Sequence, residues 1–221
     1  MDSLTTGFES FDKLVGGIPL HRNYLLNGSK ESGKDLFTYR MLQSALSNRA
    51  GVIYVTASKG ASDLLSSISL RGVNISQYLG ESLKIIDNFT RNIQPDAKDN
   101  AYTRVLNGPL DLTGLAVAVS SLNSDFVKDG KTTLNIFDSI SSLLLSNNSN
   151  TIFRFLQFIC GKSKISGVTS LFLIDSDMHS QDTNETIKSL MDGIINLKLD
   201  NGKRYFTFTG TEKEVLNWTE L

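Results

Sequence analysis

Short apolar runs alternate along this chain with longer segments of helical period, and this alternation is the feature that most constrains its fold. Near-continuous apolar runs bounded by turn residues are typical of strands buried on both faces. Strands separated by helices predict an α/β fold with a mostly parallel central sheet and helices on both faces. The predicted strands are residues 23–27, 52–56, 83–87, 133–138, 170–175 and 193–199.

Helical spacing of apolar residues predicts helices over 35–46, 62–69 and 151–160. Residues 204–209 alternate between polar and aromatic side chains after the turn at Asn201-Gly202, which predicts an antiparallel edge strand. Residues 91–109 have no clear period and mixed charge, so we expect an exposed loop there.

Composition places the chain among ordinary globular proteins. Its 221 residues favour one domain over 1–221, and its net charge of −1 gives no overall attraction to nucleic acid or membrane. The single Cys excludes a disulfide framework, and the spacing of the Cys and two His predicts no metal site. A polar, acidic start and the lack of a long apolar run predict a cytoplasmic protein without a membrane span.

Residues 28–35, GSKESGKD, carry the strongest chemical signal. They follow a predicted strand and open a predicted helix, where glycines let successive backbone N–H groups turn toward a phosphate. The segment matches seven of the eight columns of the phosphate-loop pattern G-x-x-x-x-G-K-[ST]. We therefore predict nucleotide binding by Gly28, Ser29, Lys30, Glu31, Ser32, Gly33, Lys34 and Asp35, with Lys34 reaching the β- and γ-phosphates.

The eighth column departs from this pattern. Asp35 replaces the Ser or Thr whose hydroxyl binds Mg²⁺, and Glu31 adds a second negative charge to the loop. Two unit charges about 4 Å apart interact by roughly 4 kcal/mol at an effective dielectric of 20, which can remove micromolar affinity. A loop that keeps its turn and holds no nucleotide is the alternative interpretation.

Residues 6–19, TGFESFDKLVGGIP, resemble the entry motif of KaiC-like and RadA-like members of the RecA-type P-loop ATPase superfamily. The similarity continues through the phosphate loop and then spans about residues 5–210. Its later segments are 51–56, 70–73, 136–144, 167–169, 191–197 and 202–205. The chain looks like a degenerate, archaeal-type single-domain member, which implies a RecA-like fold, ATP as ligand, and Mg²⁺ ordered by Asp138.

The resemblance also implies a catalytic Glu, often a Glu pair, after the second strand. Ser58 and Lys59 stand there, and a protonated Lys59 cannot activate water, so efficient hydrolysis is not expected. Basic residues near the late strand pair, here Lys203 and Arg204, can reach the γ-phosphate of a neighbouring subunit in this superfamily. Two solvated charges beside a turn are the simpler interpretation of this pair.

The resemblance predicts assembly with copies of itself or with a related RecA-type subunit. Nucleic-acid binding has weak support, because Asp96 and Asp99 nearly cancel Arg91, Lys98 and Arg104. The favoured function is an ATP-binding, poorly hydrolysing regulatory or accessory subunit of the recombination, repair or signalling type. The alternatives are a pseudo-ATPase that binds no nucleotide and serves as an interaction module, and a weak ATPase with an unusual base.

Overall fold

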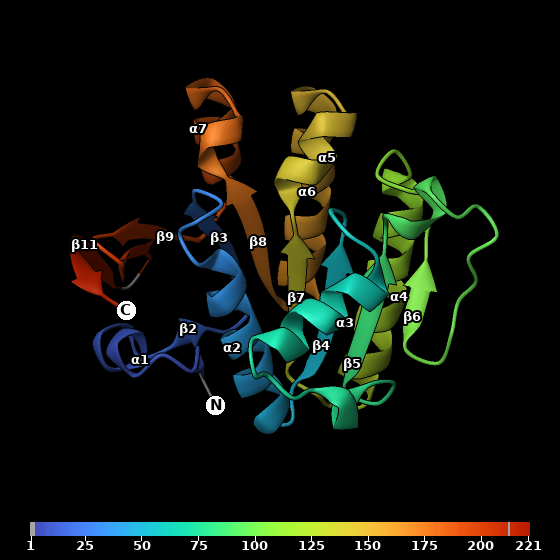
Figure 1. The fold of residues 1–221 in the computed structure, drawn as a ribbon, viewed down its shortest axis with the longest axis horizontal. Coiled ribbons are helices and arrows are strands. Elements are labelled where there is room, and N and C mark those ends of the chain that lie inside the picture. Colours follow the sequence, from blue (N-terminus) through green and yellow to red (C-terminus); the bar gives the residue numbers. More distant parts are fainter. Residues whose placement is uncertain (1–2, 212) are drawn as a thin grey trace.

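The computed structural model describes residues 3–211 and 213–221 and is built on a nine-stranded sheet (Figure 1). Its strand order is β11-β10-β9-β3-β8-β7-β4-β5-β6, and β1 and β2 form a separate two-stranded sheet. The strands are β1 (Ser3–Leu4), β2 (Ile18–Pro19), β3 (Asn23–Gly28), β4 (Gly51–Thr56), β5 (Leu83–Asp87), β6 (Thr103–Val105), β7 (Thr133–Asp138), β8 (Thr169–Asp175), β9 (Gly193–Asp200), β10 (Lys203–Gly210) and β11 (Glu214–Glu220).

Helices cover both faces of the sheet. The helices α2 and α3 lie on one face, and α4 and α6 lie on the other (Figure 1). The helices are α1 (Glu9–Val15), α2 (Lys34–Ser47), α3 (Ala61–Leu70), α4 (Leu112–Lys128), α5 (Ile140–Ser146), α6 (Ser149–Ile165) and α7 (Gln181–Lys188). Among the described helices, none has the combination of length and apolar character needed to cross a membrane.

The pairing of the strands confirms the predicted fold class. Strands β9, β3, β8, β7, β4, β5 and β6 pair in parallel, and β10 runs antiparallel to both β9 and β11. All six predicted strands are found, with small differences at their ends. The C-terminal part of the sheet is therefore antiparallel, as its alternating pattern predicts.

Two predictions need correction. Strand β10 is antiparallel as expected, but β11 pairs with its outer side, so β10 is not the edge. Residues 91–109 are not only an exposed loop, because β6 pairs with β5 and its Thr103 and Val105 are buried, as is Leu106 after it. A strand of three residues is too short to show a period of two, which is why the sequence pattern misses it.

The segment that carries the N-terminal motif supports the rest of the domain. The carboxylate of Asp12 accepts hydrogen bonds from the backbone N–H of Thr6 at 2.9 Å, from the Thr6 hydroxyl at 3.0 Å and from the Gly7 N–H at 3.2 Å. These bonds hold the chain that enters α1. The helix then buries the Phe11 ring against Phe37 of α2 and against two rings of β10.

The Phe11 contacts predict a large stability effect. Phe11 is fully buried, and its ring centre lies 4.9 Å from that of Phe206 and 5.6 Å from that of Phe37. Phe11→Ala should lower the free energy of unfolding by about 3–5 kcal/mol, because it leaves a cavity between α1 and the sheet. Urea denaturation measures this change. Leu14→Ala on the same helix is the control, since Leu14 is 50% exposed, and an equal loss in both variants would contradict the packing argument.

Candidate functional site

The register of the parallel strands brings the predicted site residues to one edge of the sheet. Gly28 at the end of β3 lies opposite Asp175 at the end of β8. Thr56 at the end of β4 lies opposite Asp138 at the end of β7. Ligands of open α/β sheets bind outside the carboxyl ends of the strands, so this edge is the expected location for a site.

A charged pocket of about 650 Å³ opens at this edge. It is lined by Lys30, Glu31, Gly33, Lys34, Asp35, Lys59, Arg71, Asp138, Ser139, Leu173, Asp175 and Arg204. Five of these side chains are basic and four are acidic. The structure therefore brings most of the predicted phosphate-loop residues together with Asp138 and Arg204.

The loop from Gly28 to Gly33 has the backbone shape that its glycines predict. Gly33 has φ +92°, and a Cβ there would lie 2.4 Å from Nε of Arg204. A Cβ on Gly28 would lie 2.6 Å from the carbonyl oxygen of Leu197 and from the hydroxyl of Ser32. At both positions a side chain would collide with neighbouring atoms, so only glycine fits.

The backbone amides at the start of α2 are open. In residues 3–211 and 213–221, no protein acceptor is found for the N–H groups of Lys30, Glu31, Gly33 and Lys34, although Ser32 N–H donates to the Ser29 carbonyl at 3.2 Å. No carboxylate in the described part of the chain accepts a hydrogen bond from these four amides. Free amides at a helix N-terminus provide the donors and the partial positive charge that favour an anion.

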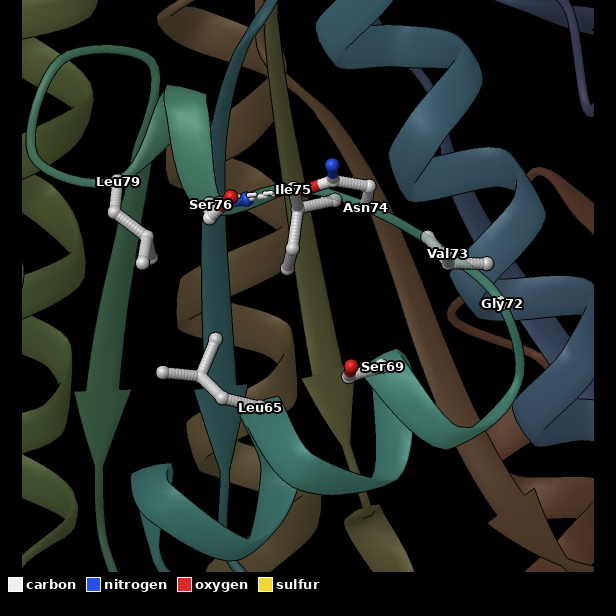
Figure 2. A pocket seen from close by; sticks show the side chains of 8 residues that line it. All are labelled: Leu65, Ser69, Gly72, Val73, Asn74, Ile75, Ser76 and Leu79. Atoms are coloured by element: carbon white, nitrogen blue, oxygen red, sulfur yellow. Dashed lines mark hydrogen bonds between the residues drawn. The ribbon is translucent and has the colours of Figure 1, made fainter.

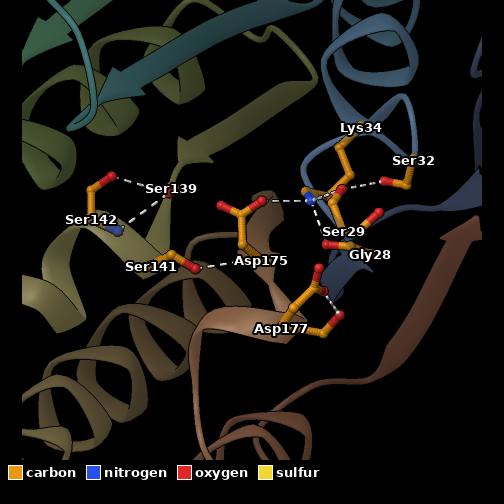
Figure 3. Close-up of polar contacts among 10 residues, drawn as sticks. Gly28, Ser29, Ser32, Lys34, Ser139, Ser141, Ser142, Asp175 and Asp177 are labelled. Atoms are coloured by element: carbon orange, nitrogen blue, oxygen red, sulfur yellow. Dashed lines mark hydrogen bonds and ion pairs between the residues drawn. The ribbon is translucent and has the colours of Figure 1, made fainter.

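Lys34 is engaged inside the protein (Figure 3). Its side chain is buried, and Nζ donates to the Gly28 carbonyl, to the Ser29 carbonyl at 2.7 Å and to Oδ1 of Asp175 at 2.8 Å. Asp175 is held in turn, because its backbone N–H donates to the Ser141 hydroxyl at 2.9 Å. The lysine predicted to reach phosphates thus has an acidic partner on the neighbouring strand.

Asp35 does not fold back onto Lys34. Its Oδ2 lies 2.8 Å from Nη2 of Arg71, which follows α3. Both side chains are about half exposed, so the pair adds little to stability. It does, however, partly neutralise the carboxylate that replaces the usual hydroxyl.

Asp138 accepts a hydrogen bond from the hydroxyl of Tyr54 at 2.8 Å. Withdrawal from water raises the pKa of the Asp138 carboxyl, although the Tyr54 bond and Lys59 act in the opposite direction. Burial and the nearby Asp138 also raise the pKa of Tyr54 well above its usual value. Asp138 is therefore a strand-end carboxylate beside the phosphate loop, at the place predicted for a residue that orders Mg²⁺.

The position predicted for a catalytic Glu holds no acid in the structure. Ser58 is exposed, Lys59 lines the pocket, and Asp63 lies in the first turn of α3 on an exposed surface outside the pocket. The other acids are engaged, since Asp35, Asp138 and Asp175 pair with Arg71, Tyr54 and Lys34. Glu31 is the one lining acid for which the described residues offer no side-chain partner.

Lys203 and Arg204 point to different surroundings. Lys203 is exposed and forms an ion pair with Glu220 of β11 at 2.9 Å, which raises the pKa of its ammonium group. Arg204 lies against Gly33 of the same chain, and its Nε is buried without a hydrogen-bond partner among the described residues. The contact of these residues with a neighbouring subunit stays a prediction.

Several residues that line the pocket were not predicted as site residues, among them the charged Asp175 and Arg71. Asp175 ends an apolar strand just as Asp138 does, and that signal could have identified it. Arg71 follows a helix, and its pairing with Asp35 joins residues that lie 36 positions apart, so no local pattern indicates it. The predicted residues Ser29 and Ser32 shape the loop through the bond from the Ser32 hydroxyl to the Ser29 carbonyl at 2.7 Å.

A second hollow of about 450 Å³ lies between α3 and the segment 72–79 (Figure 2). Leu65, Val73, Ile75 and Leu79 are its apolar lining residues, and the hydroxyl of Ser76 donates to Oδ1 of Asn74 at 2.9 Å. None of its lining residues is an acid, a base or a nucleophilic thiol. This hollow therefore offers no side chain suited to acid–base chemistry.

The donor set of the charged pocket fits a magnesium–nucleotide complex better than a transition metal. The described residues hold no group of three or more His, Cys, Asp or Glu side chains that could bind a metal alone. Mg²⁺ prefers one or two carboxylates together with phosphates and water. Asp138 and Asp35 are the carboxylates that could serve it, and the open amides and Arg204 could serve phosphates.

A strand, a glycine-turned loop with a lysine, a helix with open N-terminal amides and a strand-end aspartate define a P-loop protein of the RecA-type α/β class. The model of the ATPase family KaiC matches residues 4–210. The chain belongs to this family.

Curated relatives agree with this assignment. A UPF0273 protein of Methanopyrus kandleri is 24% identical over 206 residues, covering 90% of this chain and 78% of its own length. A UPF0273 protein of Aeropyrum pernix is 25% identical, with coverage of 90% and 79%. The circadian clock oscillator protein KaiC of Prochlorococcus marinus is 28% identical over 176 residues, covering 77% of this chain and 32% of KaiC.

Solved structures support the fold. A KaiC-like protein of Pyrococcus horikoshii aligns with a TM-score of 0.72 at 16% identity, covering 99% of this chain and 92% of its own. An uncharacterized protein of the same organism, solved with an unknown peptide, aligns with a TM-score of 0.76 at 16% identity, covering 99% and 100%.

The environment of Asp138 predicts a pH-dependent stability difference. Its native-state pKa lies above the ordinary value of 3.8, so the native state binds this proton more tightly than the unfolded state. The stabilisation is present at low pH and is lost as pH rises through the native pKa. The Asp138→Asn variant keeps an acceptor for the Tyr54 hydroxyl but does not ionise, so it should not lose this stability as pH rises.

Urea denaturation at several pH values tests this expectation. The free energy of unfolding of Asp138→Asn, minus that of the wild type, should increase from about pH 4 to about pH 8. Asp63→Asn, on the exposed face of α3, controls for the change in net charge. A difference that stays constant or falls with pH would show that burial does not govern this carboxyl.

Proposed function

We propose that this chain binds ATP with Mg²⁺ at the loop 28–35, hydrolyses it poorly, and serves as a regulatory or accessory subunit of a RecA-type assembly. The observation that carries the proposal is the row of open amides at Lys30, Glu31, Gly33 and Lys34. Gly33 and Lys34 lie at the N-terminus of a 14-residue helix, where an anion is favoured, and Lys30 and Glu31 lie in the loop that leads to it.

Basic side chains beside the loop support the same ligand. Arg204 lies over Gly33, and its buried Nε finds no acceptor in the described part of the chain, which an anion at the loop would supply. Lys30 and Lys34 line the same pocket. When Mg²⁺ is bound it would neutralise phosphate charge, with Asp138 and Asp35 as the protein groups that hold it or its water.

Slow hydrolysis follows from the acids around the pocket. Attack on a phosphate needs a carboxylate, or a comparable group, that orients the water. Lys59 occupies the predicted position of that group, and the three strand-end or helix-start aspartates already have internal partners. We infer that ligand binding, more than turnover, is the useful property of the site.

The proposal includes a cytoplasmic location and a role in recombination, repair or signalling.

It also includes assembly with copies of this chain or with a related RecA-type subunit. Membership of the KaiC family supports assembly, since proteins of this family generally form oligomers. Light scattering with and without Mg·ATP tests the assembly, which should shift to larger species when nucleotide is bound.

Calorimetric titration with Mg·ATP tests nucleotide binding. The wild type should bind, and Lys34→Met should weaken binding by about 10- to 100-fold, because a charge-assisted hydrogen bond to phosphate contributes about 1.5–3 kcal/mol. Lys30→Met is the matched control, since Lys30 is an exposed lysine of the same loop. Absence of binding by a folded wild type would instead favour the pseudo-ATPase that acts as an interaction module.

Phosphate release measures the second part of the proposal. Loss of a positioned base costs a factor of roughly 10²–10⁴, so turnover should fall below about 10⁻² per second from an ordinary value near 1 per second. Steady release at or above that ordinary rate, abolished by Lys34→Met, would show that the chain is an active ATPase with an unusual base.

A further inference from the structure

Lys34 has no hydrogen left for a ligand. An ammonium group has three N–H donors and no acceptor. The carbonyls of Gly28 and Ser29 and Oδ1 of Asp175 accept all three (Figure 3). A phosphate can therefore bind Lys34 only by taking the place of one of these acceptors.

Asp175 is the acceptor that a phosphate would replace. The two carbonyls belong to the phosphate loop itself, whereas Asp175 reaches Lys34 from the neighbouring strand β8. Asp175 is also the one anion among the three acceptors, so it supplies the charge that a phosphate oxygen would otherwise supply. A carboxylate left 2.8 Å from the lysine would repel that oxygen.

The position of Asp175 is built into the fold. Parallel pairing places it opposite Gly28, and its backbone N–H is bonded to the Ser141 hydroxyl, whose residue is buried in α5. The side chain is largely buried, with 22% of its surface exposed, and that of Lys34 is 7% exposed. Solvent therefore screens this pair much less than it screens the half-exposed pair of Asp35 and Arg71.

We propose that Asp175 is an internal competitor for phosphate, which holds Lys34 when no phosphate is bound and sets the affinity of the site for phosphate-containing ligands. This inference deepens the proposed function and rests on it. It also reassigns the main obstacle to binding. Sequence reasoning attributes that obstacle to Asp35, but Asp35 is paired with Arg71 and leaves Lys34 untouched.

The first test needs no nucleotide. Trace acetylation with acetic anhydride, read by peptide mass spectrometry, reports how freely the amine of each lysine reacts. In the wild type, Lys34 should be protected from acetylation. In the Asp175→Asn variant, Lys34 should be acetylated several-fold faster, while the other lysines keep their rates. Asp177→Asn removes the same charge from the exposed neighbouring turn, so it should leave Lys34 protected.

The second test uses inorganic tripolyphosphate as the probe, measured by calorimetry on the wild type and the same variants. Asp175→Asn should bind it on the order of tenfold more tightly than the wild type or Asp177→Asn. Asp175→Ser serves as a second variant if Asp175→Asn does not fold, as judged by circular dichroism. Equal Lys34 reactivity, or equal tripolyphosphate affinity in the folded Asp175 variant and wild type, would overturn the inference.

Titration with Mg·ATP separates the two proposals. If the Asp175 variant gains affinity for tripolyphosphate but neither protein binds Mg·ATP, the inference stands and ATP is the wrong ligand. If the wild type binds Mg·ATP and the Asp175 variant binds neither ligand more tightly, the proposed function stands and the inference is overturned.

Discussion

The parallel register of β3 and β8 is the constraint on which the site depends. It places Gly28 beside Asp175, and the next strands along the sheet place Thr56 beside Asp138. Because all four strands end at one edge, the phosphate loop, two aspartates and Lys59 meet around one pocket. A change of one position in this register would turn Asp175 away from Lys34.

The fold was largely predictable from the pattern of the chain. Fully buried strands in a parallel sheet give near-continuous apolar runs, and β3, β4, β7 and β8 show this clearly. The short elements were not predictable in the same way. Strand β6 has three residues, and no residue of β11 is buried, so neither strand shows the apolar pattern of a buried strand.

The residues of the phosphate loop could be predicted from the sequence, but the ion pairs that they form could not. Glycine spacing and the following helix are local features, so the loop 28–35 could be identified from the chain alone. The partners of its charged side chains are not local: Asp175 lies 141 positions from Lys34, and Arg71 lies 36 positions from Asp35. Coulomb interactions in a crowded pocket depend on distances of a few ångströms, which only the folded arrangement supplies.

An internal partner for Lys34 has a physical reason. A buried ammonium without a counter-ion is strongly destabilising, so Lys34 needs an anion beside it whenever no phosphate is bound. Asp175 supplies that anion at a place the strand pairing guarantees. The same contact must then be exchanged when a phosphate arrives, so stability of the empty loop and affinity for the ligand oppose each other. Asp175 itself is fixed at the end of β8, because its backbone N–H is bonded to the Ser141 hydroxyl of α5. Under the slow hydrolysis that we propose, this exchange would let the site report a bound phosphate ligand.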